Sequence, residues 1–282
     1  MITVNIAGGL GNQLFQYAAA RSLNLKSGKN VKLILDVSFF ENIQSFDTHR
    51  DFKLGEFNIK IDAISHIKSY RILRLIYRMV LRPFSSDIQI IIFKFLIKLN
   101  IPVYLTRNFQ KEKYFMEIRK VLLSELTLKN KLSVDAEKTK NDIEKDISVS
   151  LHVRRSDYVK MNNVYGDCSI TYYQKSVEMI KNKFNNAVFY IFSDDIEWVQ
   201  QNLKILSDCI YVSSVNMKDY EELILMSKCK HNIIANSTFS WWGAWLNQNN
   251  DKIVIAPKYW FKNKTSNEIG VLPEKWIQLK NN

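Results

Sequence analysis

Apolar and polar positions alternate with a clear rhythm in the C-terminal half of the chain. Runs of β-branched and aromatic residues predict strands over 147–153, 187–193, 209–213, 231–235 and 252–256. Apolar residues at helical spacing between these runs predict helices over 170–184, 195–203, 217–229 and 239–248. Strands and helices that alternate in this way are typical of a parallel, doubly wound sheet.

The N-terminal half opens on the same alternation. Its pattern predicts a strand over 2–7, a glycine-rich turn, a helix over 13–27 and a strand over 31–36. Residues 40–146 are mostly helical in pattern, and they end in a polar stretch that is poor in apolar residues.

A chain of 282 residues is long enough for two domains of ordinary size. We therefore predict an α/β protein with two Rossmann-like domains facing a cleft. The predicted domains are residues 1–146 and 147–282, and the last ~20 residues are expected to pack back on the N-terminal domain.

Residues 67–99 combine apolar spacing with repeated lysine and arginine. Charges interrupt each apolar run well short of the ~18 residues that a spanning helix needs, so the segment predicts two helices broken at Pro83. Their basic faces could rest on an anionic membrane surface, or they could be the solvated faces of bundle helices. The second interpretation is the simpler one.

The net charge of +12 and the pI of about 9.4 indicate an anionic partner: nucleic acid, a membrane surface or a phosphorylated substrate. The basic residues are spread over the chain, without zinc-finger spacing, an RNP-like motif or a basic arm, so nucleic acid is not the expected partner. An apolar content of 46% and a mean hydropathy of −0.19 are typical of a soluble protein with a sizeable core.

Cysteine usage and the N-terminus both favour a cytoplasmic protein. Cys168, Cys209 and Cys229 are odd in number and widely spaced, which predicts reduced thiols rather than a disulfide framework or a zinc site. The first residues predict a strand and lack the basic and apolar regions of a signal peptide. We expect a cytoplasmic location, with peripheral contact to the inner membrane face as an option for residues 67–99.

The strand predicted at 147–153 ends in a charged motif, His152-Val153-Arg154-Arg155-Ser156-Asp157. Ligands bind at this end of the strands in an open α/β sheet, and paired arginines suit a pyrophosphate. An ion-paired cluster is the alternative. Because side chains alternate along a strand, His152 and Arg154 should share one face and Arg155 should point to the other.

The glycine-rich turn at 8–13 follows a strand and opens a helix, as a phosphate-binding loop does. Gly9 and Gly11 match the dinucleotide fingerprint, but Leu14 occupies the third glycine position. Asp36 lies about where a ribose-binding acid would fall. A turn that needs glycine for positive φ is an equally good interpretation, and Asn12 would present an amide to a ligand there.

Two more strand ends carry polar residues. Ser193-Asp194-Asp195 starts a helix, where capping or a ligand hydroxyl is expected more than a metal. Asn236-Ser237-Thr238-Phe239 also opens a helix, with hydroxyls and N–H groups suited to phosphate. The tryptophans that follow are expected in the core. Glu222 could accept two hydrogen bonds from a guanine edge.

The chain closely resembles the α-1,2-fucosyltransferases of glycosyltransferase family 11 in four motifs: GGLGNQLFQYA (8–18), HVRRSDY (152–158), SDD (193–195) and NSTFSWWGAWLN (236–247). The resemblance spans nearly the whole chain, although residues 60–146 contribute little. It implies a GT-B-like fold and inverting, metal-independent transfer of L-fucose from GDP-β-L-fucose to the 2-hydroxyl of a galactose, which is expected to be terminal and β-linked, in a glycan. The N-terminal domain would form the acceptor side and the C-terminal domain would bind the donor. The animal enzymes carry a membrane anchor that is absent here, so the chain resembles a bacterial form.

The resemblance also implies roles for individual residues. Arg154 should bind the β-phosphate with support from Arg155, and His152 and Glu222 should bind the guanine. The donor-binding turns would further include Gly9, Gly11, Asp194, Asn236, Ser237, Thr238 and Phe239. Asn12 would approach the fucose. Ser156 departs from the glycine of many relatives, which should alter local backbone freedom more than chemistry.

Single displacement needs no covalent intermediate, and a base would help to remove the acceptor proton. Asp157 is the candidate base, with orientation of an arginine as its alternative role. No cofactor or metal is expected. The competing hypotheses are a GDP-sugar transferase with another acceptor linkage, a nucleotide-dependent oxidoreductase, and a basic membrane-surface or nucleic-acid binder.

Overall fold

A computed structural model describes residues 1–28, 30–41, 50–66, 75, 77, 79–81, 83–155, 168–203, 209–214, 216–262 and 264–281. The chain divides into two compact units, Met1–Asn130 and Lys131–Asn282. This division lies earlier than the predicted boundary at 146/147. The helix α5 (Val134–Lys145) belongs to the second unit because its Ala136 and Ile143 pack with Tyr190, Phe192 and Leu225.

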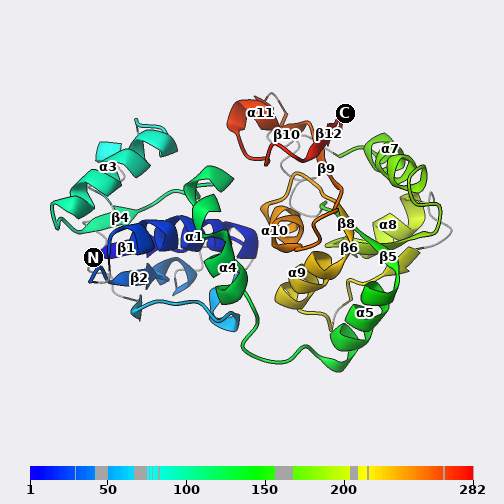
Figure 1. Ribbon diagram of the computed structural model, residues 1–282, viewed down its shortest axis with the longest axis horizontal. Coiled ribbons are helices and arrows are strands. Elements are labelled where there is room, and N and C mark those ends of the chain that lie inside the picture. Colours follow the sequence, from blue (N-terminus) through cyan, green and yellow to red (C-terminus); the bar gives the residue numbers. More distant parts are fainter. Residues whose placement is uncertain are drawn as a thin grey trace. The chain divides into compact units, whose positions relative to one another are not determined.

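The first unit contains a four-stranded sheet with the order β3-β2-β1-β4. All its pairings are parallel. The strands are β1 (Ile2–Asn5), β2 (Leu33–Asp36), β3 (Ala63–Ser65) and β4 (Val103–Leu105). β1, β2 and the intervening helix α1 (Leu10–Lys26) confirm the predicted order of strand, helix and strand (Figure 1). Sequence pattern did not reveal β3 and β4, because three residues are too few to show a period.

The rest of the first unit is helical. It contains α3 (Ser86–Lys98), α4 (Arg119–Glu125) and the 3₁₀ turns η1 (Ser38–Glu41), η2 (Leu54–Glu56), η3 (Glu112–Tyr114) and η4 (Met116–Ile118). Within the predicted helical pair 67–99, the described residues 75, 77 and 79–81 are helical, and α3 begins after Pro83. The Ser85 hydroxyl accepts from the Ile88 N–H at 3.4 Å and caps α3.

The second unit contains a six-stranded sheet with the order β12-β9-β8-β5-β6-β7, again with every pairing parallel. The strands are β5 (Ile147–Val153), β6 (Ala187–Ser193), β7 (Cys209–Tyr211), β8 (His231–Ile233), β9 (Val254–Pro257) and β12 (Ile277–Leu279). A small hairpin of β10 (Tyr259–Phe261) and β11 (Lys264–Thr265) precedes the short helix α11 (Ser266–Ile269). Because β12 pairs with β9, this last strand belongs to the sheet of the second unit. The expectation that the last ~20 residues pack back on the N-terminal domain stays a prediction.

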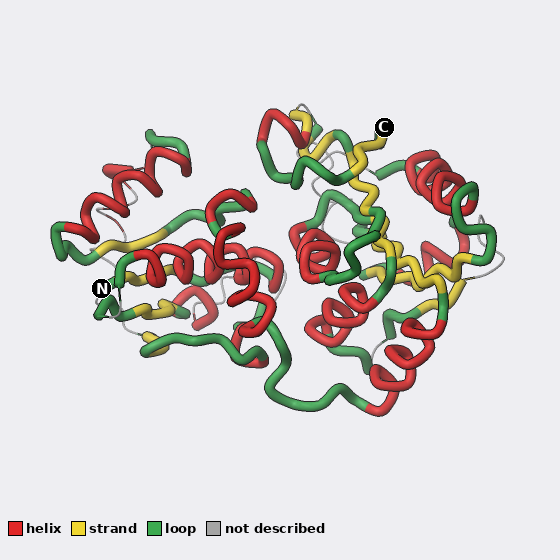
Figure 2. The backbone as a smooth tube through the Cα atoms, in the orientation of Figure 1, coloured by secondary structure: helices red, strands yellow, loops and turns green. Residues whose placement is uncertain are grey.

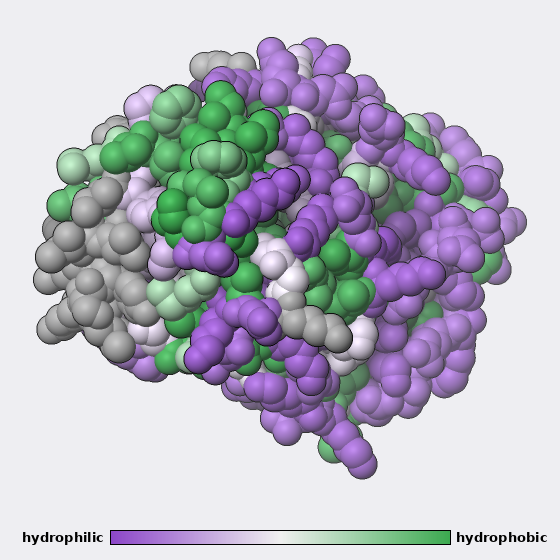
Figure 3. Space-filling view, turned by 60° about the vertical axis from the view of Figure 1, so that its left-hand side comes forward, coloured by the Kyte–Doolittle hydropathy of each residue, from purple (hydrophilic) through white to green (hydrophobic). Residues whose placement is uncertain are grey.

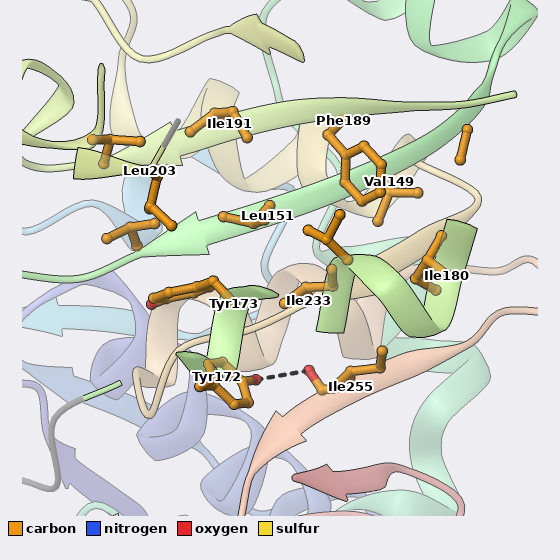
Figure 4. Close-up of a cluster of buried hydrophobic side chains, with 14 residues drawn as sticks. Val149, Leu151, Tyr172, Tyr173, Ile180, Phe189, Ile191, Leu203, Ile233 and Ile255 are labelled. Carbon is orange, nitrogen blue, oxygen red and sulfur yellow. Dashed lines mark hydrogen bonds between the residues drawn. The ribbon is translucent and has the colours of Figure 1, made fainter. Parts of the chain in front are cut away.

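Helices cover both faces of this sheet, as Figure 2 shows for the second unit. They are α7 (Ile170–Lys181), α8 (Ile196–Asn202), α9 (Asp219–Lys228) and α10 (Thr238–Leu246), together with α5. On one face, α7 and α8 pack on Val149, Leu151 and Ile191 (Figure 4). On the other face, α5 and α9 pack on Tyr190 and Phe192. The predicted doubly wound arrangement is therefore confirmed.

The helix α10 is apolar and buried. Trp241, Trp242 and Trp245 are at most 2% exposed, so the expectation that they form core is confirmed. Gly243 permits close contact between α10 and α9, since a Cβ there would lie 2.8 Å from Met226 Cβ. This packing fixes the N-terminus of α10 beside the end of β8.

Each sheet has a switch point, where successive crossovers leave in opposite directions. In the first unit it lies between β1 and β4, and in the second between β5 and β8. Ligands of open parallel sheets bind at the carboxyl ends of the strands at such points. The glycine-rich turn follows β1, and the His-Val-Arg-Arg motif ends β5.

Candidate functional site

His152 lies near the carboxyl end of β5, on the face that α9 and α10 cover. Its side chain is 3% exposed, and its ring centre lies 5.7 Å from that of Phe239. Burial, opposed by Asp194 and assisted by Arg154, lowers the pKa of His152 to about 3, so the imidazole is neutral. Its Nδ1 is buried without a hydrogen-bond partner in the described part of the chain. Such an unsatisfied atom in a polar strand end points to a ligand.

Asp194 holds the backbone and a side chain at the end of β5. Its Oδ2 lies 3.1 Å from Nη1 of Arg154, and its Oδ1 accepts from the Arg155 N–H at 2.9 Å. The side chains of Arg154 and Asp194 are both about one-fifth exposed, so the ion pair is reachable from solvent. The structure thus places a guanidinium at the switch point with its orientation fixed.

Arg155 occupies the opposite side of the strand end, against α8. Its guanidinium lies 3.7 Å from the ring centre of Trp198, and its Nε lies 3.2 Å from Oδ2 of Asp195. The same Asp195 caps α8, because its Oδ1 accepts from the Trp198 N–H at 3.2 Å. The two arginines therefore have different surroundings, as the alternation of the strand predicts. Sequence reasoning missed Trp198, although it follows Asp195 at the spacing of a helical turn.

The acids at 194 and 195 form ion pairs and a cap in the described structure. Within the described residues, no three His, Cys, Asp or Glu side chains are grouped as metal ligands. The positive charge at this strand end comes from Arg154 and Arg155.

The turn after β8 forms the second wall of the switch point. Ser237 is 5% exposed, and its hydroxyl accepts from the Phe239 N–H at 3.3 Å at the start of α10. Thr238 and Phe239 are half-buried in the first turn of that helix. Helix N-termini present N–H groups that suit an anion.

Asn236 has a different place from its neighbours. Its Nδ2 donates to the Trp260 carbonyl at 3.0 Å, and its Oδ1 accepts from Cys168 at 3.7 Å. The amide therefore braces the turn from inside, where it is 2% exposed.

Glu222 lies in the first turn of α9 and is half-buried. Burial raises the pKa of this carboxyl to about 7, with the charges of Asp219 and Asp194 acting in the same direction and a hydrogen bond with Ser213 opposing them. The Ser213 hydroxyl also accepts from the Ser193 N–H at 2.9 Å, at the end of β6. Glu222 is thus electrostatically coupled to Asp194 and titrates near neutral pH.

Glu221 has a structural role, unlike the residue beside it. It is 4% exposed, and its carboxylate accepts from the backbone of Ser133 at 2.6 Å and of Lys218 at 3.2 Å. It therefore ties the start of α5 to the start of α9.

The glycine-rich turn of the first unit follows β1. Gly8 has φ +79°, and a Cβ there would lie 3.0 Å from Nδ2 of Asn12. Gly9 is the N-cap of α1, with Gly11 in the first turn, and a Cβ on Gly9 would lie 3.7 Å from a guanidinium nitrogen of Arg50. Asn12 Oδ1 accepts from Nε2 of Gln110, which follows β4, at 2.8 Å.

Two buried glutamines hold this turn in place. Gln13 donates to the Gly8 and Asp51 carbonyls at 2.9 and 2.8 Å and accepts from the Lys53 N–H at 2.9 Å. Gln16 accepts from the Ala7 N–H and donates to Asn108, both at 2.9 Å. Sequence reasoning missed these partners, because they lie up to 92 residues away in the chain.

Asp36, the residue at the position of a ribose-binding acid, is engaged within the first unit. It is 1% exposed and accepts from the Tyr104 hydroxyl and from the Ser38 N–H. Leu14, in place of the third fingerprint glycine, is fully buried in the core. Neither placement favours the dinucleotide interpretation of the turn.

Asp157 lies outside the described residues.

The two parallel-sheet units give the chain an α/β, GT-B-like fold. The chain belongs to glycosyl transferase family 11, whose sequence profile matches residues 1–280. It is 33% identical to an alpha-1,2-colitosyltransferase of Escherichia coli over 300 residues, which covers 99% of each chain. It is 26% identical to galactoside alpha-(1,2)-fucosyltransferase 2 of Rattus norvegicus over 180 residues, 59% of this chain and 50% of that one. The crystal structure of a family 9 glycosyl transferase from Veillonella parvula shares the fold, with a TM-score of 0.50, 12% identity, and coverage of 99% of this chain and 86% of that one.

Proposed function

We propose that this glycosyltransferase moves L-fucose from GDP-β-L-fucose to the 2-hydroxyl of a terminal, β-linked galactose in a glycan. The observation that carries the proposal is the β5–β8 switch point, where the oriented Arg154 and the unpartnered Nδ1 of His152 lie in a chain of family 11. The 1,2 linkage rests on the alpha-1,2 specificity for which the E. coli and rat relatives are named.

The pyrophosphate of the donor suits the charge at the end of β5. Arg154 would bind the β-phosphate, and its ion pair with Asp194 would either be kept or be replaced by the phosphate. Arg155, which stacks on Trp198, would add positive charge nearby. The N–H groups at the start of α10 would bind phosphate oxygens, with Thr238 and Phe239 lining that turn. Asp194 would help to hold the donor through the arginine that it orients.

The guanine is assigned to His152 and Glu222. A carboxylate accepts two hydrogen bonds from N1–H and the exocyclic amine of guanine. The neutral ring of His152 offers Nδ1 as a donor or acceptor according to its tautomer. Folding has already removed much of the water from both side chains. A guanine that hydrogen-bonds to them would therefore cost little additional desolvation free energy.

We propose an inverting single displacement. The acceptor oxygen attacks the anomeric carbon as the bond to the β-phosphate oxygen breaks, and the hydroxyl proton passes to a base. Arg154 stabilises the charge that grows on the departing GDP. Asp157 is the proposed base on sequence grounds, and Asn12 is assigned to the fucose through its amide. The positive charge at the leaving group comes from arginine, so turnover should survive EDTA.

A colitosyl donor is the second candidate, favoured by the 33% identity to the E. coli colitosyltransferase. Colitose is the 3-deoxy form of L-fucose, so the two donors differ in one hydroxyl. Parallel assays with GDP-L-fucose and its 3-deoxy analogue measure kcat/KM for each. A fucosyltransferase that binds the 3-hydroxyl loses on the order of 100-fold or more with the deoxy donor. Preference for the deoxy donor would assign the colitosyl activity instead.

The deciding experiment incubates the protein with labelled GDP-fucose and a panel of β- and α-galactosides, and reads the linkage by NMR. The proposal predicts an α-1,2-fucosyl product on a terminal β-galactoside. Another linkage would support a related GDP-sugar transferase. No transfer, no thermal shift on adding GDP and salt-sensitive binding to nucleic acid would support a basic binding protein.

A further inference from the structure

The helix α3 exposes an apolar stripe. Ile88, Ile91, Phe95 and the C-cap residue Leu99 are 44–65% exposed. At about 100° per residue, their positions fall within an arc of roughly 80° on the helix. We call these four residues the α3 stripe.

The other side of α3 is already packed in the first unit. Gln89, Ile90, Phe93 and Ile97 are buried, and the Phe93 ring lies 6.5 Å from that of Phe109. The helix is therefore apolar on two opposite sides, a pattern typical of helices that are covered on both. Figure 3 shows hydrophobic side chains gathered on the face of the molecule that carries this helix.

The surroundings of the stripe extend it and make it basic. Phe84 and Ile101, at the two ends of α3, are also exposed. Lys94 and Lys98 are exposed, and at about 100° per residue both lie along one edge of the stripe. Long lysine side chains can lie along apolar surface while their ammonium groups reach outward.

The single acid of α3 does not offset this charge. Asp87 pairs with Lys111 at 3.0 Å and with Lys113 at 2.7 Å. Although partial burial opposes it, hydrogen bonds from Lys113, Lys111 and Tyr114 lower the pKa of Asp87 to about 2. Among the described residues, Lys94 and Lys98 are exposed on α3, and Asp87 is matched by two lysines. These described charges are therefore net positive.

We propose that the α3 stripe docks on the surface of a membrane that contains anionic lipids, with the helix lying in the plane of the interface. Apolar side chains would enter the acyl boundary while the flanking lysines meet the phosphate groups. With 13 residues the helix is about 20 Å long, shorter than the ~30 Å hydrocarbon core. No helix in the described part of the chain is long and apolar enough to cross a membrane.

Charge favours lipid over a second copy of this chain. In a two-fold symmetric contact, the same patch faces itself, so the lysines of both copies would lie at one interface. Like charges brought together at an interface cost several kcal/mol. An anionic bilayer complements both the apolar stripe and its basic edge. This proposal is independent of the donor, because vesicle binding requires no turnover.

The test is flotation of the full chain with vesicles of phosphatidylcholine alone, and of phosphatidylcholine mixed with phosphatidylglycerol. The proposal predicts binding to the mixed vesicles that weakens as salt rises. The variant Ile91→Glu/Phe95→Glu should lose about 10-fold or more of the bound fraction, and Lys94→Glu/Lys98→Glu should lose a similar part only on anionic vesicles. The stripe is exposed, so thermal unfolding should confirm that these variants fold.

Val134→Glu and Lys138→Glu are matched controls on α5 of the second unit, where both positions are exposed. They should bind vesicles like the wild type. The proposal is overturned if the wild type ignores anionic vesicles, or if the stripe variant binds as well as the controls. It is also overturned if light scattering shows a lipid-free dimer that Ile91→Glu/Phe95→Glu converts to monomer, since the stripe would then be a contact between copies.

Discussion

The two switch points of the molecule are built from different chemistry. In the second unit, ion pairs shape the strand end: Arg154 with Asp194 and Arg155 with Asp195. In the first unit, the neutral amides of Gln13 and Gln16 fasten the glycine-rich turn through hydrogen bonds to the backbone and to Asn108. Charges suit a pyrophosphate whose negative charge grows during reaction, while the buried glutamine amides hold the backbone of their turn in place. The same topological position is thus built from charged groups in one unit and from neutral amides in the other.

The largest expected effect is the loss of Arg154, which we propose to face the leaving group. Arg154→Ala should lower kcat by roughly 100- to 1,000-fold at saturating donor, because it removes charge stabilisation in the transition state. Arg154→Lys should recover only part of this, since a lysine lacks the planar fork of the guanidinium. A kcat near that of the wild type for Arg154→Ala would contradict the claim that charge at the second switch point acts on the leaving group.

The hydrogen bonds of Gln13 and Gln16 should contribute to the stability of the first unit rather than to the chemistry of transfer. Gln13→Ala removes three part-buried hydrogen bonds, to the Gly8 and Asp51 carbonyls and from the Lys53 N–H, so the free energy of unfolding should fall by about 2–4 kcal/mol. Denaturant unfolding measures this loss. Gln278→Ala removes one solvent-exposed hydrogen bond to Asn267 and is the matched control, with an expected loss of at most about 0.5 kcal/mol. Equal losses of unfolding free energy in the two variants would show that Gln13 contributes no more to stability than an exposed side chain does.

Glu222 gives the second switch point a pH dependence that the amides of the first unit lack. Its raised pKa of about 7 means that the carboxyl is protonated below neutral pH. If guanine requires the carboxylate, GDP affinity is retained above pH 7 and falls by up to about 10-fold for each unit below it. Glu222→Gln should bind GDP weakly and lose this dependence between pH 5 and 8. A wild-type affinity that is flat across that range would contradict the guanine assignment.

A smaller effect is expected from the residue that positions Arg155. Trp198→Ala removes the ring on which the guanidinium stacks, worth about 0.5–1 kcal/mol at an exposed site, so kcat/KM should fall a few-fold. Trp198→Phe should restore most of it, because a phenyl ring also attracts a cation. Loss of stability without any change in kcat/KM would assign Trp198 to packing alone.

Much of the second unit could be predicted from sequence, and less of the first. Each strand of the second sheet from β5 to β9 is an apolar run bounded by polar turns. The sequence therefore predicts both these strands and their parallel, doubly wound arrangement with the intervening helices. The alternation along β5 also predicts that His152 and Arg155 lie on opposite faces of the strand. In the first unit, β3 and β4 are too short to show a period, and the partners of Gln13 and Gln16 come from distant loops.

Two features lay beyond any local pattern. The periodicity of α3 predicts an apolar face but does not say whether other residues cover that face. The exposure of the stripe is therefore known only from the tertiary structure. The pKa of Glu222 depends on burial and on Asp194, which comes from a different strand end. Both are consequences of packing between elements rather than of propensity within them.

The most direct test of the account is calorimetric titration of GDP into the wild type, Arg154→Ala and Asn12→Ala. GDP lacks the sugar, so the account predicts that Arg154→Ala weakens binding by roughly 10-fold or more while Asn12→Ala leaves the dissociation constant unchanged. Asn12→Ala should instead lower turnover with GDP-fucose. If the wild type fails to bind GDP, or if Asn12→Ala weakens GDP binding as much as Arg154→Ala does, then the assignment of the nucleotide to the β5–β8 switch point is wrong.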